Sequence, residues 1–191
     1  LQAPSNSLID TAMCMVLEQM LAAPFFNVLR TEKQLGYVVG TGYVPHNQHP
    51  GMAFYIQSPS HAPEALLKEM TSFLFEQLNE IDFYRFYWST IQKNLLKQLE
   101  ERDLSLSMKS QRLWVCLGTQ DLAFDRNAKL ADLISRTSFQ DIQAYANKIA
   151  ERNVFGELVL FASGKFPSMD VSDDKKLKDL ALFKKTTQNF Q

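Results

Sequence analysis

The chain has 191 residues, 46% of them hydrophobic and 21% charged, which is typical of a soluble globular protein about the size of one domain. Its formal net charge of -1 provides no basic surface for a phosphate backbone, so we expect no nucleic-acid partner. No apolar run approaches the roughly 20 residues of a membrane helix, and we expect no membrane partner. The chain begins with Leu1 rather than Met, and we expect a fragment or a processed product of a longer protein.

The first predicted element is a helix with a polar start. Ser7 and Asp10 have capping-box spacing, and the apolar residues that follow recur at helical intervals. Those residues are Ile9, Met13, Val16 and Met20. We expect Pro24 to interrupt this helix and a short second helical piece to run from Phe25 to Arg30.

A hairpin is predicted next. The segment 35–44 is rich in β-branched and aromatic residues, 45–51 is a loop of turn residues, and 52–57 returns as a second strand. Gly36, Gly40 and Gly42 share one face of the first strand, which predicts that a helix or another chain packs closely there.

The remainder is predicted to be mostly helical. Helices are expected from Pro63 to about Leu78, from Asp82 to Leu99, near 113–117, over 127–134, and from a second capping box at Ser138 and Asp141 onward. Residues 157–163 are predicted to form a buried strand, and the charged tail from Asp173 a short helix or a frayed end. The order indicates an α+β fold, an antiparallel sheet with helices packed on one face, in a single domain over 1–191.

Few side chains are placed for catalysis or metal binding. His46 and His49 lie in a proline-flanked loop without further ligands nearby, and we interpret them as part of a solvated loop; His61 is expected just before a helix. Cys14 and Cys116 lie in apolar runs and are expected to be buried free thiols, although a disulfide between them stays open. We therefore predict no metal site in this chain.

One segment combines two useful donors at a helix-to-strand link. Arg30 ends the second helical piece and Tyr37 begins the first strand, so a short irregular link could bring both to one rim of the sheet. A guanidinium suits backbone or terminal carboxylates, and a phenol offers a further donor. Periodicity alone favours a helix-end charge at Arg30 and core or rim packing at Tyr37 over a functional role.

This segment resembles a known family signature. The run Arg30-Thr-Glu-Lys-Gln-Leu-Gly36-Tyr37 closely matches the Arg-Thr-x-x-Gln-Leu-Gly-Tyr signature of the pitrilysin/insulin-degrading peptidases, in the last of their four domains. The order of elements is similar to that domain over most of the chain.

The resemblance implies a parent zinc endopeptidase that cleaves peptides in a closed chamber. In the family the zinc is held by a His-x-x-Glu-His motif in the first domain, and this sequence has none, so we expect zinc only in another domain of the parent chain and no activity from this chain alone. Arg30 would bind substrate backbone, Tyr37 would donate to the carbonyl oxygen, and Gly36 would let the backbone turn between them. The implied partners are peptide substrates and other domains of the parent.

The sequence leaves two matters open. Some relatives in this superfamily have lost catalysis, so an inactive scaffold or assembly domain is the alternative function. The resemblance implies a periplasmic protein if the parent is a bacterial pitrilysin-like enzyme, or else a cytoplasmic one.

Overall fold

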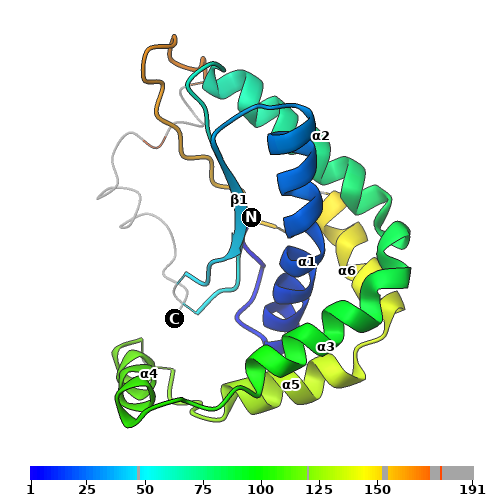
Figure 1. Cartoon of the computed structure of the whole chain (residues 1–191), viewed down its shortest axis with the longest axis vertical. Helices are drawn as coiled ribbons and strands as arrows, with labels where there is room; N and C mark the ends of the chain where they lie inside the picture. The colour runs from blue at the N-terminus through cyan, green and yellow to red at the C-terminus, as the bar shows by residue number, and fades with distance from the viewer. Residues whose placement is uncertain (47, 120, 152–154, 173–176, 178–191) are drawn as a thin grey trace.

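The computed structural model describes the chain except for residues 47, 120, 152–154, 173–176 and 178–191. It confirms the predicted α+β class, with a two-stranded antiparallel sheet and helices on one of its faces (Figure 1). The predicted tail from Asp173 onward falls outside the described residues apart from Leu177.

The first helix is longer than the sequence predicts. Helix α1 spans Leu8–Phe26 and continues directly into the π-helical turn η1, Asn27–Glu32, so the expected interruption at Pro24 is wrong. Proline inside a helix costs about 3 kcal/mol. Burial of apolar residues on both sides of Pro24 offsets that cost, because Leu21, Phe25 and Leu29 are all fully buried.

The polar start of α1 is confirmed in part. The Ser7 side chain accepts a hydrogen bond from the Asp10 backbone N–H at 3.1 Å, as an N-cap should. The Asp10 carboxylate does not complete the capping box. It accepts bonds from Ser5 at 2.5 Å and from Tyr145 at 2.9 Å instead.

The predicted hairpin is present and its register explains one of its glycines. Strand β1, Val38–Tyr43, pairs antiparallel with β2, Met52–Gln57, and Gly40 lies opposite Tyr55. A Cβ at Gly40 would be 2.6 Å from the Tyr55 hydroxyl oxygen, so the Tyr55 side chain lies across the glycine. The prediction of a helix or another chain on this face is therefore wrong at Gly40, since a neighbouring strand supplies the close contact.

The helices form two layers behind the hairpin. Helix α1 packs on β1, and an outer arc of helices packs on the far side of α1 (Figure 1). The arc contains α2 (Pro63–Asn79), the 3-10 turn η2 (Ile81–Tyr87), α3 (Trp88–Leu99), α5 (Arg126–Arg136) and α6 (Phe139–Ala150). The helix predicted from Asp82 thus begins as η2, and the second predicted capping box, Ser138 with Asp141, is confirmed at α6.

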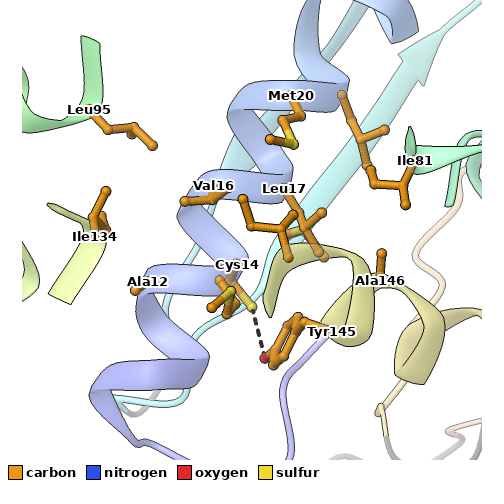
Figure 2. Packing of buried hydrophobic residues seen from close by; sticks show 14 of the residues in the cluster. Ala12, Cys14, Val16, Leu17, Met20, Ile81, Leu95, Ile134, Tyr145 and Ala146 are labelled. Carbon is orange, nitrogen blue, oxygen red and sulfur yellow. Dashed lines mark hydrogen bonds between the residues drawn. The ribbon is translucent and has the colours of Figure 1, made fainter. Parts of the chain in front are cut away.

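The main core lies between α1 and this arc. Val16, Leu17 and Met20 of α1 meet Ile134 of α5 and Ala146 of α6, all nearly or fully buried (Figure 2). Among the described residues, every buried side-chain nitrogen or oxygen has a hydrogen-bond partner. The Cys14 thiol lies 3.9 Å from the Tyr145 hydroxyl, and that hydroxyl donates to Asp10 at 2.9 Å.

Two segments stand outside this core. Helix α4, Leu106–Gly118, begins before the predicted 113–117 piece and has no buried residue. Residues 157–163, predicted to be a buried strand, are an exposed coil in which Leu158 is 70% and Leu160 85% exposed. In the described part of the chain this apolar run has no neighbouring strand to pair with.

The cysteines and the long helix modify two further expectations. Both thiols are free; Cys14 is buried as predicted, but Cys116 on α4 is partly exposed.

The continuous helix from Leu8 to Glu32 is long and apolar enough to pass as a membrane span, although half of its most apolar window is buried in the protein. A core helix passes the same test, and the absence of a membrane partner stays a prediction.

Candidate functional site

The segment from Arg30 to Tyr37, called the rim below, joins η1 to β1. Its helix end closes in an unusual way. The Lys33 N–H bonds to the Val28 carbonyl at 2.9 Å across a π turn, Gln34 takes a left-handed conformation with φ 51°, and the Leu35 N–H bonds back to the Leu29 carbonyl at 2.9 Å. A left-handed residue after a helix commonly reverses the chain direction in this manner.

A small aromatic cluster holds the rim from below. Leu29 and Leu35 are buried on either side of the turn and pack with Phe25, Phe73 and Val39. The Phe25 ring lies 5.3 Å from that of Phe54 on β2 and 5.5 Å from that of Phe73 on α2. Because the apolar residues of the rim point into this cluster, its polar residues are turned outward.

Gly36 brings the rim against β2. A Cβ at this position would lie 2.5 Å from the Gln57 carbonyl oxygen and 2.7 Å from a methyl carbon of Ile56. The close approach lets the Tyr37 N–H bond to the Gln57 carbonyl at 2.9 Å. The structure corrects the expected role of Gly36, because the left-handed turn is made by Gln34 and the glycine serves close backbone contact.

Arg30 and Tyr37 lie together on the outer side. The Arg30 Nε donates to the Tyr37 carbonyl oxygen at 3.3 Å, and its guanidinium carbon lies 5.0 Å from the centre of the Phe26 ring. Both residues are exposed, Tyr37 to 79%. Within the described part of the chain, the Tyr37 hydroxyl and the terminal nitrogens of Arg30 make no hydrogen bond, so these donors face outward unpaired.

Sequence reasoning missed three supports of this site. Phe26 lies one helical turn before Arg30, and its ring stacks against the Arg30 guanidinium. Gln34 supplies the left-handed turn. Lys33 forms an ion pair with Glu69 of α2 at 2.5 Å, which ties the rim to the outer helices. The four-residue spacing of Phe26 and Arg30 could have indicated the stacking. The π turn that places Gln34 in a left-handed conformation could not be predicted from the spacing of apolar residues.

Metal binding finds no support in these residues. Among the described residues, no three or more His, Cys, Asp or Glu side chains are grouped to hold a metal ion. His46 and His49 pair through their backbones at the hairpin tip, with bonds of 2.9 and 3.0 Å, and the His61 ring lies beside Ser58 and Ser60 just before α2. A zinc ion of the kind that the family signature implies therefore does not fit the residues described in this chain.

Comparison with known proteins places this fold and rim in one class. The structure resembles a crystal structure of pitrilysin with a TM-score of 0.64 over 78% of this chain and 16% of that one, at 22% sequence identity. The family model for the PQQ synthase PqqF-like C-terminal lobe domain 4 matches residues 16–114, which include the whole rim. The chain belongs to this family, a C-terminal domain of the pitrilysin/insulinase type.

Curated relatives give the same grouping at low identity. The chain is 35% identical to coenzyme PQQ synthesis protein F of Pseudomonas protegens over 114 residues, 58% of this chain and 14% of that protein. It is 30% identical to a nardilysin-like protein of Arabidopsis thaliana over 133 residues, covering 66% of this chain and 12% of that protein. Human insulin-degrading enzyme is 28% identical over 153 residues, 78% of this chain and 14% of that enzyme. The chain thus spans about one seventh of the curated relatives that it matches.

Proposed function

We propose that this chain is the substrate-holding C-terminal domain of a longer zinc metalloendopeptidase that cleaves peptides in a closed chamber. The observation that carries the proposal is the pair of outward donors on the rim, the guanidinium of Arg30 and the phenol of Tyr37, fixed seven residues apart by backbone bonds and a buried cluster. Membership of the pitrilysin/insulinase group supports a peptidase parent. The described residues do not fit zinc, so the metal is assigned to another domain of the parent chain.

Each rim residue has a distinct role in this proposal. Arg30 donates a hydrogen bond from Nε to the Tyr37 carbonyl, and this bond holds the Arg30 side chain in place. Its two terminal nitrogens then donate to carbonyl oxygens of a peptide backbone. Tyr37 donates its hydroxyl to the carbonyl oxygen of the bond being cleaved as negative charge develops there. The phenol is anchored through its own backbone N–H and needs little reorganisation when that charge appears.

The test is steady-state peptide hydrolysis by the parent enzyme. We expect Tyr37→Phe to lower kcat about 100- to 1000-fold with KM little changed, because one donor to a developing oxyanion contributes about 3 to 4 kcal/mol in the transition state. Tyr55→Phe is the matched control, since Tyr55 lies on the same hairpin with its ring across Gly40. It should leave kcat unchanged.

Arg30 is tested in the same assay. Arg30→Ala should raise KM more than it lowers kcat if the guanidinium holds the peptide throughout the reaction. An unchanged kcat in Tyr37→Phe together with an unchanged KM in Arg30→Ala would reject the substrate-holding role and favour a scaffold domain. The location of the parent enzyme, periplasmic or cytoplasmic, is likewise proposed only from the family resemblance.

A further inference from the structure

Strand β1 is the outer strand of the hairpin and is paired on one side only. Strand β2 lies between β1 and the start of the chain, since Gln2 bridges to Gly51 and the Met52 N–H donates to the Leu1 carbonyl at 2.8 Å. In the described part of the chain, no strand pairs with the other edge of β1. We call this the free edge of β1.

Two hydrogen bonds show which backbone groups face the free edge. The Val44 N–H donates to the Gly51 carbonyl at 2.8 Å, so these two residues form a hydrogen-bonded pair. The Met52 N–H, one residue further along, points away from β1 and bonds to Leu1. Hydrogen-bonded and non-hydrogen-bonded pairs alternate along an antiparallel sheet, so these bonds fix the alternation for the whole hairpin.

The register then assigns the residues of β1. Gly42 and Gly40 form hydrogen-bonded pairs with Ala53 and Tyr55. The alternate residues turn their N–H and carbonyl groups toward the free edge, and they are Val39, Thr41 and Tyr43. Within the part of the chain that the structure describes, these groups form no backbone hydrogen bond. Natural edge strands are commonly protected by lysine or proline, and residues 38–43 contain neither.

Thr41 lies at the centre of the accessible part of this edge. Val39 is buried, with 7% of its surface exposed, whereas residues 40–43 are half-buried. The Thr41 hydroxyl donates to the Glu18 carboxylate of α1 at 2.6 Å, which turns the side chain toward the helix. The Thr41 backbone N–H and carbonyl are thus left to face the edge as an unused donor and acceptor pair.

The free edge is continuous with the rim. Arg30 lies at the start of β1, where its Nε donates to the Tyr37 carbonyl at 3.3 Å. Thr41 follows Tyr37 by four residues, about 13 Å along an extended chain. A peptide whose backbone is held by Arg30 and Tyr37 therefore needs only about four further residues to reach Thr41.

We propose that a peptide substrate binds as an extended strand along the free edge of β1, with one of its residues paired to Thr41 through both backbone groups. This inference rests on the proposed function and specifies its substrate. Pairing of this kind recognises the backbone of an added strand, so the substrate is an unfolded segment with little restriction on the side chain opposite Thr41. Proline or an N-methylated residue is excluded at that position, because it has no N–H to donate to the Thr41 carbonyl.

Thr41→Pro in the parent enzyme removes the donor of this pair. An edge strand tolerates proline where its N–H would face outward. Thr41→Val is the matched control, because it keeps the N–H but, like proline, lacks the hydroxyl that bonds to Glu18. We expect the KM of a fluorogenic peptide to be about tenfold higher in Thr41→Pro than in Thr41→Val, with kcat within about twofold. Equal KM values in two folded variants would overturn the proposal.

N-methylated peptides show whether the substrate backbone is the partner of Thr41. The same peptide is prepared with a single N-methyl group at each residue in turn. In Thr41→Val, methylation of the residue opposite Thr41 should raise KM about tenfold. In Thr41→Pro the same methyl group should raise KM less than about twofold, because the pair is already broken. Effects that add independently at every position would overturn the proposal.

Hydrogen exchange of the unmodified parent gives a readout that does not depend on the folding of a variant. The metal is chelated to prevent cleavage, and a saturating peptide is added. We expect the amides of Thr41 and Tyr43 to exchange at least about tenfold more slowly with peptide, and those of Gly40 and Gly42 to stay unchanged. Unchanged exchange at Thr41 and Tyr43, including the case in which another segment of the parent already protects them, overturns the proposal.

The outcomes separate this inference from the proposed function. If Tyr37→Phe lowers kcat while Thr41→Pro behaves like Thr41→Val, only strand addition at the free edge is rejected. If peptide protects the Thr41 amide in a parent that hydrolyses no peptide, only the peptidase assignment is rejected.

Discussion

The buried cluster around Tyr145 and the exposed rim both bring polar side chains together, and they differ in what surrounds them. In the buried cluster of Asp10, Cys14 and Tyr145, every polar group has a partner and solvent is excluded. On the rim, Arg30 and Tyr37 are held by backbone bonds, and within the described chain their outer donors have no partner. The difference indicates that a group of reactive residue types is not by itself a site. The pair that we propose to hold substrate is the one whose donors are fixed in place and have no partner within the described chain.

The largest expected difference between the two places is in alkaline solution. Burial raises the pKa of the Cys14 thiol from an ordinary value of 9.0 to about 11, and also raises the pKa of Tyr145. A group with a raised pKa contributes stability that is fully present below the unfolded pKa and is lost as pH rises through the folded pKa. We therefore expect the free energy of unfolding to fall between about pH 9 and pH 11, by roughly 2 to 3 kcal/mol from Cys14 alone.

Urea unfolding at a series of pH values measures this loss. Cys14→Ala should lower the free energy of unfolding at pH 7, but that free energy should then fall less steeply above pH 9. In Tyr37→Phe it should fall as steeply as in the unaltered chain. A free energy of unfolding that stays flat up to pH 11 would contradict the burial of this thiol.

The next largest effect comes from removing one hydroxyl of the buried cluster. Tyr145→Phe takes a hydrogen bond from the buried Asp10 carboxylate and should cost about 1.5 to 3 kcal/mol of folding stability. Tyr37→Phe removes the same atom from an exposed ring and should change stability by less than about 0.5 kcal/mol. Urea unfolding measures both changes. Equal losses in the free energy of unfolding would contradict the distinction between a buried cluster and an exposed rim.

A comparable but slightly smaller loss of stability than that of Tyr145→Phe is expected where the rim meets β2. Gly36→Ala places a methyl group 2.5 Å from the Gln57 carbonyl oxygen and should cost about 1 to 3 kcal/mol, the usual range for overpacking. Gly42→Ala is the control, because a Cβ there has its nearest neighbour at 3.8 Å. In the parent enzyme Gly36→Ala should also lower kcat, since the backbone that carries Tyr37 must shift. A variant with normal stability and normal kcat would show that the close contact does not position Tyr37.

Local sequence patterns predicted most of the fold but not its tertiary adjustments. The caps at Ser7 and Ser138 and the hairpin follow from short-range chemistry, and all three were predicted. Pro24 was misread because burial of Phe25 and Leu29 outweighs the local cost of proline. Residues 157–163 contain the continuous apolar run of a buried strand, but such a segment becomes a strand only beside a partner.

The residues of the candidate site and their meeting at one rim were predicted, but the turn that holds them was not. The family signature pointed to Arg30 and Tyr37, and the structure places them side by side and exposed. Their supports could not be read from the chain, because a π turn and the left-handed Gln34 depend on the Leu29–Leu35 packing beneath them. The substrate role of the pair stays a proposal.

Photo-cross-linking from the rim to a bound peptide tests the central claim most directly. A photoreactive benzoylphenylalanine replaces Tyr37 in the parent enzyme, or Tyr55 in the control, and a peptide substrate is bound before irradiation. The account predicts that the peptide attaches at position 37 and not at position 55, as mass spectrometry would detect. No attachment at position 37, or equal attachment at both positions, would contradict the assignment of the rim as the peptide-holding surface.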